Sequence, residues 1–233
     1  MKAIILAAGL SSRLHPRTLE IPKCLLPLHG MTIMGHQLDM LQSHGVTDVT
    51  VIVGFLGEAI RQEIGDRVTY TEYPDFADTN NLHTLNHCRH LLDDDCVILF
   101  ADVLMEKSAL GALVNAPEDF ALFVDTTRCL EGTMRVLIED GAITDIGGHI
   151  PAALGQGNFI GIAKFSRAGA TKLSAEMEAM TAEPGREQEY YVQAMPRLAR
   201  QGHTVNPVEI GARWLEIDTG AEYEDALTLD FYV

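Results

Sequence analysis

The sequence predicts an α/β fold: a Rossmann-like, three-layer α/β/α arrangement with a mostly parallel central mixed sheet and a small antiparallel β addition. Two observations support this prediction. Short apolar runs alternate with helix-like stretches through the first half of the chain, which is the rhythm of βαβ units and of a parallel sheet covered on both faces. In the second half, the pair Asp140-Gly141 separates two strand-like runs, which is typical of an antiparallel hairpin.

The first half opens with the apolar run 3–6, which suits a buried strand. A helix is expected over 32–45, because Ile33, Leu38 and Leu41 form an apolar stripe and Gly45 marks its end. The other elements predicted for this half are strands at 49–53, 68–72 and 96–101 and helices at 57–64 and 81–92.

The second half mixes both kinds of element. Helices are expected at 108–114, 168–180, 190–201 and 221–229, and strands at 120–125, 135–139, 142–146, 158–165, 205–209 and 214–217. Pro196 lies inside the predicted helix 190–201, so a start, break or kink is expected near it. With no linker or repeat in the sequence, residues 1–233 are predicted to form a single domain. Its nucleotide-binding half runs to about residue 101, and its acceptor-binding half covers about 102–233.

Composition narrows the classes of function. The chain of 233 residues carries a formal net charge of -16, which disfavours nucleic acid and anionic membranes as partners. Its four cysteines form no C-x-x-C pair and match no zinc spacing. Reduced cysteines, and the absence of a signal-like or membrane-spanning run, predict a cytoplasmic protein. The oligomeric state stays open, and a homodimer is compatible with the sequence.

The stretch 3–28 is the strongest functional signal. Its strand runs into a turn of small residues, which leaves backbone N–H groups free to face an anion. Arg13 supplies a forked cation suited to phosphate, and Lys23 follows Pro22 as a second cation. Small-residue turns are common, so the turn alone is a weak signal, but this order of features describes a polyphosphate cradle. Its predicted nucleotide-binding residues are Leu6, Ala7, Ala8, Gly9, Ser11, Ser12, Arg13 and Lys23.

Carboxylates supply the second signal. Asp102 directly follows the apolar strand 96–101, and Glu216 and Asp218 alternate about Ile217 near a later strand. Ligands of open α/β sheets bind at the carboxyl ends of the strands, so the loops after residues 6, 53, 73 and 101 are expected to line one crevice. The alternatives are a helix cap or loop turn for Asp102, a cap for Asp218 and a solvated face for Glu216.

Three further groups have both a structural and a functional interpretation. Asn80 and Asn81 precede a predicted helix, where they suit an N-cap, although amide side chains also read a base or a phosphate. The residues Glu189, Tyr190 and Trp214 suit either a core or an aromatic and acidic wall for an ammonium group. His83 and His149 are weaker candidates for substrate contacts.

The ordered combination LAAG, Ser-Ser-Arg and Pro-Lys closely resembles the signature L-A-A-G-x-G-[ST]-R-x-x-P followed by P-K of sugar-1-phosphate-type nucleotidyltransferases, with Ser11 in place of the second glycine. The segment 73–85, with Thr79-Asn80-Asn81, looks like that of the bacterial phosphocholine cytidylyltransferases and of their relatives that act on 2-aminoethylphosphonate. This resemblance implies a GT-A-type fold and Mg²⁺ held by Asp102 and Asp218, with Glu216 beside them.

The resemblance and the residues together predict a Mg²⁺-dependent nucleotidyltransferase. It would transfer CMP from CTP to a small phosphorylated or phosphonate acceptor and release pyrophosphate, with Lys23, Arg13 and Asp102 as catalytic residues and with acceptor contacts from Glu189, Tyr190 and Trp214. A sugar-1-phosphate nucleotidyltransferase is the nearest alternative. Molybdopterin nucleotidyl transfer shares the opening loop, and a non-catalytic nucleotide-binding regulatory module is the alternative from another class.

Overall fold

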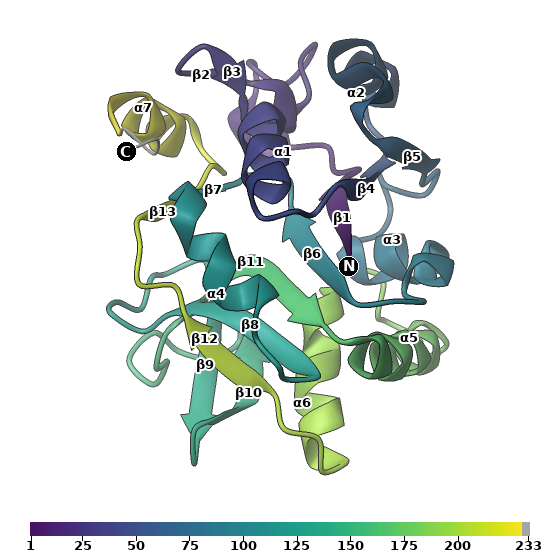
Figure 1. Cartoon of the computed structure of the whole chain (residues 1–233), viewed down its shortest axis with the longest axis vertical. Helices are drawn as coiled ribbons and strands as arrows, with labels where there is room; N and C mark the ends of the chain where they lie inside the picture. Colours follow the sequence, from purple (N-terminus) through teal and green to yellow (C-terminus); the bar gives the residue numbers. More distant parts are fainter. Residues whose placement is uncertain (230–233) are drawn as a thin grey trace.

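A mixed sheet forms the centre of the molecule, and the computed structural model describes residues 1–229 of the chain (Figure 1). Its strands are β1 (Lys2–Ala7), β4 (Asp48–Val53), β5 (Thr69–Glu72), β6 (Cys96–Phe100), β8 (Phe120–Asp125), β9 (Met134–Glu139), β10 (Ala142–Gly147), β11 (Asn158–Phe165) and β12 (Asn206–Glu209). The main path of neighbours is β10-β9-β11-β6-β1-β4-β5, and β8 pairs with both β11 and β12. This arrangement confirms the predicted fold class.

Strand directions divide the sheet. β1 pairs in parallel with β4 and β6, and β4 pairs in parallel with β5. β11 runs antiparallel to β6, β8 and β9, and the hairpin β9–β10 turns at Asp140 and Gly141, which both have positive φ angles. Within this sheet, the predicted βαβ half is therefore parallel throughout. The predicted hairpin belongs to the second half, where pairing is antiparallel except between β12 and β8.

The helices pack around this sheet. They are α1 (Ile33–Ser43), α2 (Gly57–Ile64), α3 (Asn81–His87), α4 (Leu110–Val114), α5 (Arg167–Thr181), α6 (Ala194–Arg200) and α7 (Gly220–Thr228). In Figure 1, α3, α5 and α6 gather along one flank, where α5 contacts both α3 and α6. Helix α4 packs on β8 and β11. Helix α7 lies apart from these, next to the strands β2 and β13 (Figure 1).

Three short strands are absent from the prediction. They are β2 (Pro27–Leu28), β3 (Met31–Thr32) and β7 (Val103–Met105), and β7 pairs with β13 (Trp214–Glu216) outside the central sheet. Strands of two or three residues are too short to show a period of two. The pairing of β7 with β13 joins parts of the chain that are far apart in sequence, and it positions the acidic residues described below.

Two helices differ most from their predicted lengths. The helix predicted at 81–92 ends at His87 and continues as a 3-10 turn at Arg89–Leu91. The helix predicted at 190–201 begins at Ala194, after a 3-10 turn at Tyr191–Gln193. Pro196 is thus in the first turn of α6, where its missing N–H needs no partner within the helix.

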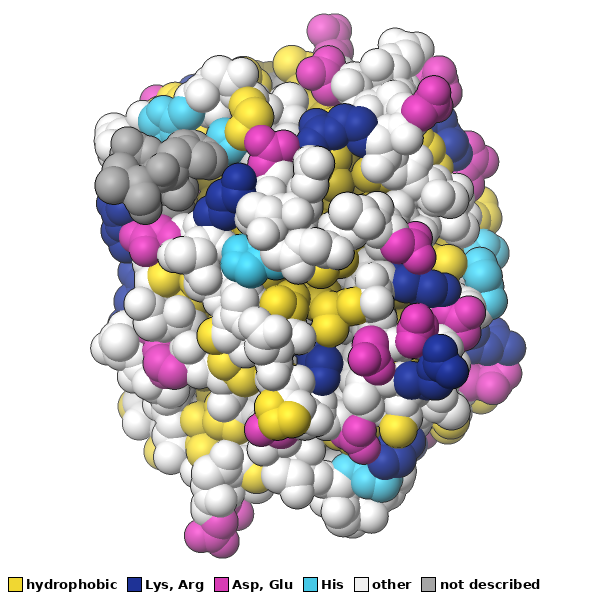
Figure 2. All heavy atoms as spheres, viewed as in Figure 1, with side chains coloured by type: hydrophobic (Ala, Val, Ile, Leu, Met, Phe, Trp, Pro, Cys, Tyr) yellow, Lys and Arg dark blue, Asp and Glu magenta, His cyan; other side chains and the backbone are white. Residues whose placement is uncertain are grey.

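A large apolar core joins both halves of the chain. Its buried cluster extends from Ala3 on β1 to Trp214 on β13, and a smaller cluster packs Tyr223 of α7 against Leu28 and Leu104. None of the four cysteines forms a disulfide. No helix among residues 1–229 has the length and apolar character needed to cross a membrane. On the face shown in Figure 2, acidic and basic side chains are interspersed, with no continuous basic patch.

Candidate active site

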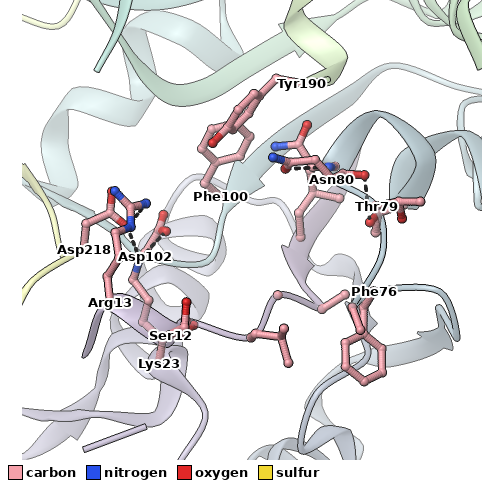
Figure 3. A pocket seen from close by; sticks show the side chains of 18 of the residues that line it. Ser12, Arg13, Lys23, Phe76, Thr79, Asn80, Phe100, Asp102, Tyr190 and Asp218 are labelled. Atoms are coloured by element: carbon pink, nitrogen blue, oxygen red, sulfur yellow. Dashed lines mark hydrogen bonds and ion pairs between the residues drawn. The ribbon is translucent and has the colours of Figure 1, made fainter. Parts of the chain in front are cut away.

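A cavity of about 380 Å³ opens at the carboxyl ends of β1 and β6 (Figure 3). Its walls come from both halves of the chain, and the lining residues are Leu6, Ala8, Gly9, Leu10, Ser11, Ser12, Arg13, Lys23, Phe76, Ala77, Thr79, Asn80, Asn81, Thr84, Phe100, Asp102, Gln188, Tyr190, Glu216 and Asp218. The structure therefore brings together the opening loop, the asparagine pair and all three predicted metal-binding carboxylates.

The opening loop follows β1 and leads into a 3-10 turn at Ser12–Leu14. Ser11 has φ 54° and ψ 37°, a left-handed conformation that favours glycine. This fits the glycine that the related signature carries here, and in this chain a serine adopts the left-handed conformation. The side chain of Thr18 helps to fix this turn by donating a hydrogen bond to the Ser11 carbonyl oxygen, 2.8 Å away.

The loop after β4 supports the cradle without lining the cavity. Its Phe55 N–H donates to the Ala8 carbonyl oxygen at 3.0 Å, and Gly54 packs directly against Ala8 and Phe76. The expectation that the loop after residue 53 lines the crevice is therefore wrong. The segment after β1 lines the cavity there, and the loop after β4 contacts that segment.

Lys23 lies at the centre of an ion-pair network. Its Nζ is 2.7 Å from Oδ2 of Asp102 and 2.6 Å from Oδ1 of Asp218. Arg13 reaches the same Asp218 oxygen through Nη2 at 2.9 Å. Figure 3 shows these four side chains converging on one side of the cavity. Burial opposes the charge of Lys23, but Asp102 and Asp218 outweigh that effect and raise the pKa of the ammonium. Lys23 is therefore cationic.

Pairing of β7 with β13 brings the acidic residues together. Glu216 on β13 pairs in register with Val103 on β7. Just beyond that pair, the Ile217 N–H donates to the Asp102 carbonyl oxygen at 3.0 Å. Asp102 and Asp218 thereby meet across the ladder, although they come from distant parts of the sequence.

The acidic group has the donor chemistry of a divalent-metal site. Asp102, Glu216 and Asp218 each offer a carboxylate oxygen, and these oxygens lie within 4.8 Å of one another. Oδ1 of Asp102 is buried and has no hydrogen-bond partner among the described residues. Burial, reinforced by Asp102 and Asp218, raises the pKa of Glu216 to about 8. Hard oxygen ligands of this kind fit Mg²⁺. A cation there would reduce the repulsion between the carboxylates and would give Oδ1 of Asp102 a partner.

The asparagine pair has a structural role that leaves donors free. Asn80 caps α3 by accepting the Asn81 N–H on Oδ1 at 2.7 Å, and Asn81 Oδ1 accepts the Tyr191 N–H at 2.8 Å. Each carboxamide oxygen is thus used by the backbone. Among residues 1–229, neither side-chain NH₂ group has a partner. Both asparagines line the cavity, so these donors are available to a ligand.

The three predicted acceptor-binding residues lie in three different places. Tyr190 lines the cavity beside Phe100, with ring centroids 6.3 Å apart. Glu189 lies in a neighbouring depression and pairs with Arg186 at 3.0 Å. The structure does not bring Trp214 to either place, because its indole is buried and its Nε1–H donates to Asp125 at 2.8 Å.

The two histidines that the sequence suggests as substrate contacts also lie outside the main cavity. His83 contacts the Arg186 carbonyl oxygen through Nε2 at 3.1 Å, and His149 pairs with Asp145 at 2.9 Å.

Residues missed by sequence reasoning include Phe76, Phe100 and Gln188, which line the cavity. Phe76 lies within the segment 73–85 that stood out for its asparagines. Phe100 and Gln188 carried no signal, because one belongs to an apolar strand and the other to a polar break.

Comparison with known proteins shows the family of the chain. The sequence model of the family of MobA-like NTP transferase domains matches residues 3–179. The chain is similar to the CTP:phosphoglutamine cytidylyltransferase of Campylobacter jejuni, with 26% identity over 96% of this chain and 98% of that protein. It is 38% identical to the CMP-5'-(3-aminopropyl)phosphonate synthase of Streptomyces rubellomurinus over 62% of this chain, a match that covers only 24% of that relative's length.

Among solved structures, the CTP:phosphocholine cytidylyltransferase of Streptococcus pneumoniae has the same fold. The TM-score is 0.78 at 22% identity, with 97% of each chain covered. The inositol-1-phosphate CTP transferase of T. maritima aligns with a TM-score of 0.79 at 19% identity, over 97% of this chain and 94% of that one. The chain belongs to the family of MobA-like NTP transferase domains, and cytidylyltransferases are among its relatives.

Proposed function

We propose that the protein is a Mg²⁺-dependent cytidylyltransferase that transfers CMP from CTP to a small phosphorylated or phosphonate acceptor and releases pyrophosphate. One observation carries the proposal. A single cavity contains the small-residue loop after β1, the Lys23 network and, on another wall, the unpartnered amide donors of Asn80 and Asn81. This is a site with one end for phosphates and another for a base.

The base end supports a pyrimidine. The free NH₂ groups of Asn80 and Asn81 suit the ring carbonyl and ring nitrogen acceptors of cytosine. The relatives from Campylobacter jejuni and Streptomyces rubellomurinus are both named for cytidine nucleotides. We therefore propose CTP rather than another nucleoside triphosphate.

At the phosphate end, backbone N–H groups near Ala8 and Gly9, together with Arg13, would hold the triphosphate. An oxygen of the acceptor's phosphate or phosphonate attacks the α-phosphorus in line. A new P–O bond forms, the bond from the α-phosphorus to the bridging oxygen of the β-phosphate breaks, and pyrophosphate leaves with that electron pair. Lys23 would neutralise the charge that develops around the α-phosphate. No protein nucleophile is needed, because the acceptor is an anion, and catalysis is positioning and electrostatics.

Asp102 and Asp218, with Glu216 beside them, are the residues proposed to hold Mg²⁺. When bound, the ion neutralises phosphate charge and orients acceptor and nucleotide. Lys23 and Arg13 already contact these carboxylates, so they would keep the acidic group compact before the ion arrives. We also propose that the two halves of the chain act as one domain, since both contribute walls to the cavity. The free cysteines support the proposal that this domain is cytoplasmic.

An acceptor screen tests the proposal. The purified protein is incubated with each of four nucleoside triphosphates and Mg²⁺, in turn with phosphocholine, 2-aminoethylphosphonate and hexose-1-phosphates, and pyrophosphate release is measured. Release with CTP and one of the first two acceptors supports the proposal. Release only with a hexose-1-phosphate would indicate the sugar-1-phosphate activity. No release with any of these pairs, nor with the amide-bearing acceptor described in the next section, would indicate a non-catalytic nucleotide-binding module.

A further inference from the structure

A second cavity, of about 330 Å³, lies beside the first and shares Gln188 and Tyr190 with it. Its walls also include His149, Glu189 and Gln193. We infer that it receives the end of the acceptor that is distant from the phosphate, and that this end is an uncharged hydrogen-bonding group of the amide class rather than a quaternary ammonium. The inference rests on the proposed cytidylyl transfer and adds the substrate class.

Glu189, the carboxylate among the residues that line the cavity, already has a cationic partner. Glu189 pairs with Arg186 at 3.0 Å, and Arg186 also pairs with Glu183 at 2.9 Å. His149 pairs with Asp145 at 2.9 Å. Among the lining residues, which all belong to the described part of the chain, no unpaired carboxylate is left for a cation. A permanently charged ammonium would lose water there and would have to compete with Arg186 for Glu189.

Aromatic side chains do not compensate for the missing charge. Cages for quaternary ammonium groups use several aromatic faces, and Tyr190 is the one aromatic ring of Phe, Tyr or Trp among the residues that line this cavity. Trp214, the tryptophan of the chain, is held in the core by its hydrogen bond to Asp125. The walls therefore lack both usual ways of binding a trimethylammonium group.

Two glutamines instead present a fixed donor and a fixed acceptor. Gln193 Oε1 accepts the Tyr190 N–H at 2.9 Å, so the Gln193 NH₂ group is the part left over. Gln188 Nε2 donates to the Asp78 carbonyl oxygen at 2.8 Å, which leaves Oε1. Each orientation is set by a backbone partner that has only one hydrogen-bonding role. Within residues 1–229 these two remaining groups have no partner, and they match the C=O and N–H of an amide.

Three acceptors that differ only at the distant end test the inference. They are phosphocholine, phosphoethanolamine and N-acetylphosphoethanolamine, which share an ethyl phosphate. We expect kcat/KM for the acetylated acceptor to exceed that for phosphocholine at least about tenfold, the effect of one well-placed hydrogen bond. An equal or higher value for phosphocholine overturns the inference and leaves the cytidylyltransferase assignment intact. Pyrophosphate release with none of these or the other acceptors overturns the assignment itself.

The variant Gln193→Glu separates recognition from folding. Glutamate retains an oxygen for the Tyr190 N–H but replaces the free NH₂ group with a carboxylate. We expect the preference for the acetylated acceptor over phosphocholine to fall about tenfold, through a higher KM for the acetylated acceptor, with KM for CTP unchanged. Gln42→Glu, at an exposed position of α1, is the matched control and should leave the ratio unchanged. An unchanged ratio in Gln193→Glu contradicts the inference.

Discussion

Lys23 Nζ lies 2.6 Å from Oδ1 of Asp218, although 195 positions separate the two residues in the chain. This ion pair joins an early and a late segment of the chain in the wall of the cavity. Arg13 shares the same oxygen at 2.9 Å. One carboxylate thus fixes both cations proposed to act on phosphate, and the acidic and basic parts of the site depend on each other.

Removing the ammonium of Lys23 tests its electrostatic role. We expect Lys23→Ala to lower kcat by about 10²- to 10³-fold at saturating CTP and Mg²⁺, because one preorganised charge in a buried site supplies about that much. Pyrophosphate release is the measurement. Lys107→Ala, at an exposed lysine, is the matched control. Near-normal turnover in Lys23→Ala would exclude the proposed mechanism.

The metal assignment is tested by Asp102→Asn and Asp218→Asn. Each substitution replaces a hard anionic ligand with a neutral one, so both variants should bind Mg²⁺ at least about tenfold more weakly, as seen for changes around metal sites. Isothermal titration with Mg²⁺ in the presence of CTP measures this directly, and a chelator should abolish turnover of the unchanged protein until Mg²⁺ is restored. Asp225→Asn, on the exposed face of α7, should behave like the unchanged protein. Unaltered Mg²⁺ affinity in both site variants would contradict the assignment.

Gly54 tests whether the loop after β4 supports the phosphate cradle. A Cβ at this position would lie 2.8 Å from the Ala8 carbonyl oxygen and 2.7 Å from the Phe76 ring. Gly54→Ala must therefore displace the opening loop, and a displacement of about 1 Å near reacting groups costs up to about 10²-fold in rate. We expect a rise in KM for CTP, measured by steady-state kinetics. Gly220→Ala, where nothing lies within 4 Å of the new Cβ, should leave that KM unchanged.

Asp125 should stabilise the protein in a pH-dependent way. Burial acts to raise the pKa of Asp125, but hydrogen bonds from Thr127, Trp214 and Arg128 outweigh it and lower the pKa below its usual 3.8. The ionised carboxylate therefore stabilises the fold above the unfolded pKa, and this contribution disappears as pH falls through the lower folded value. We expect Asp125→Asn to reduce the free energy of unfolding by about 1–3 kcal/mol at pH 7.

Urea titrations followed by the fluorescence of the single tryptophan measure this difference. It should shrink as the pH is lowered from about 5 to about 3. Asp66→Asn, at an exposed position, provides the matched comparison. A difference between Asp125→Asn and the unchanged protein that stays constant over that range would show that the charge of Asp125 is not what stabilises the fold.

Strand positions were predictable wherever the apolar run was long. β8 and β11 have the predicted bounds, because six to eight consecutive residues of a buried strand leave a clear signature. β7 was not predictable, since three residues show no period and its partner β13 is remote in sequence. The same pairing decides where Glu216 and Asp218 lie, so the assembly of the acidic group is a tertiary result.

Local chemistry determined much of this protein by itself: the apolar rhythm specified the fold class, and the small-residue loop with Arg13 and Lys23 predicts a phosphate site. Only the tertiary structure decided which candidates meet. It placed Asp102, Glu216 and Asp218 together, put Trp214 in the core and paired Glu189 with Arg186. The physical reason is that burial and ion pairing depend on contacts between distant segments, whereas turn geometry and hydrophobic periodicity depend on residues that are neighbours in the sequence.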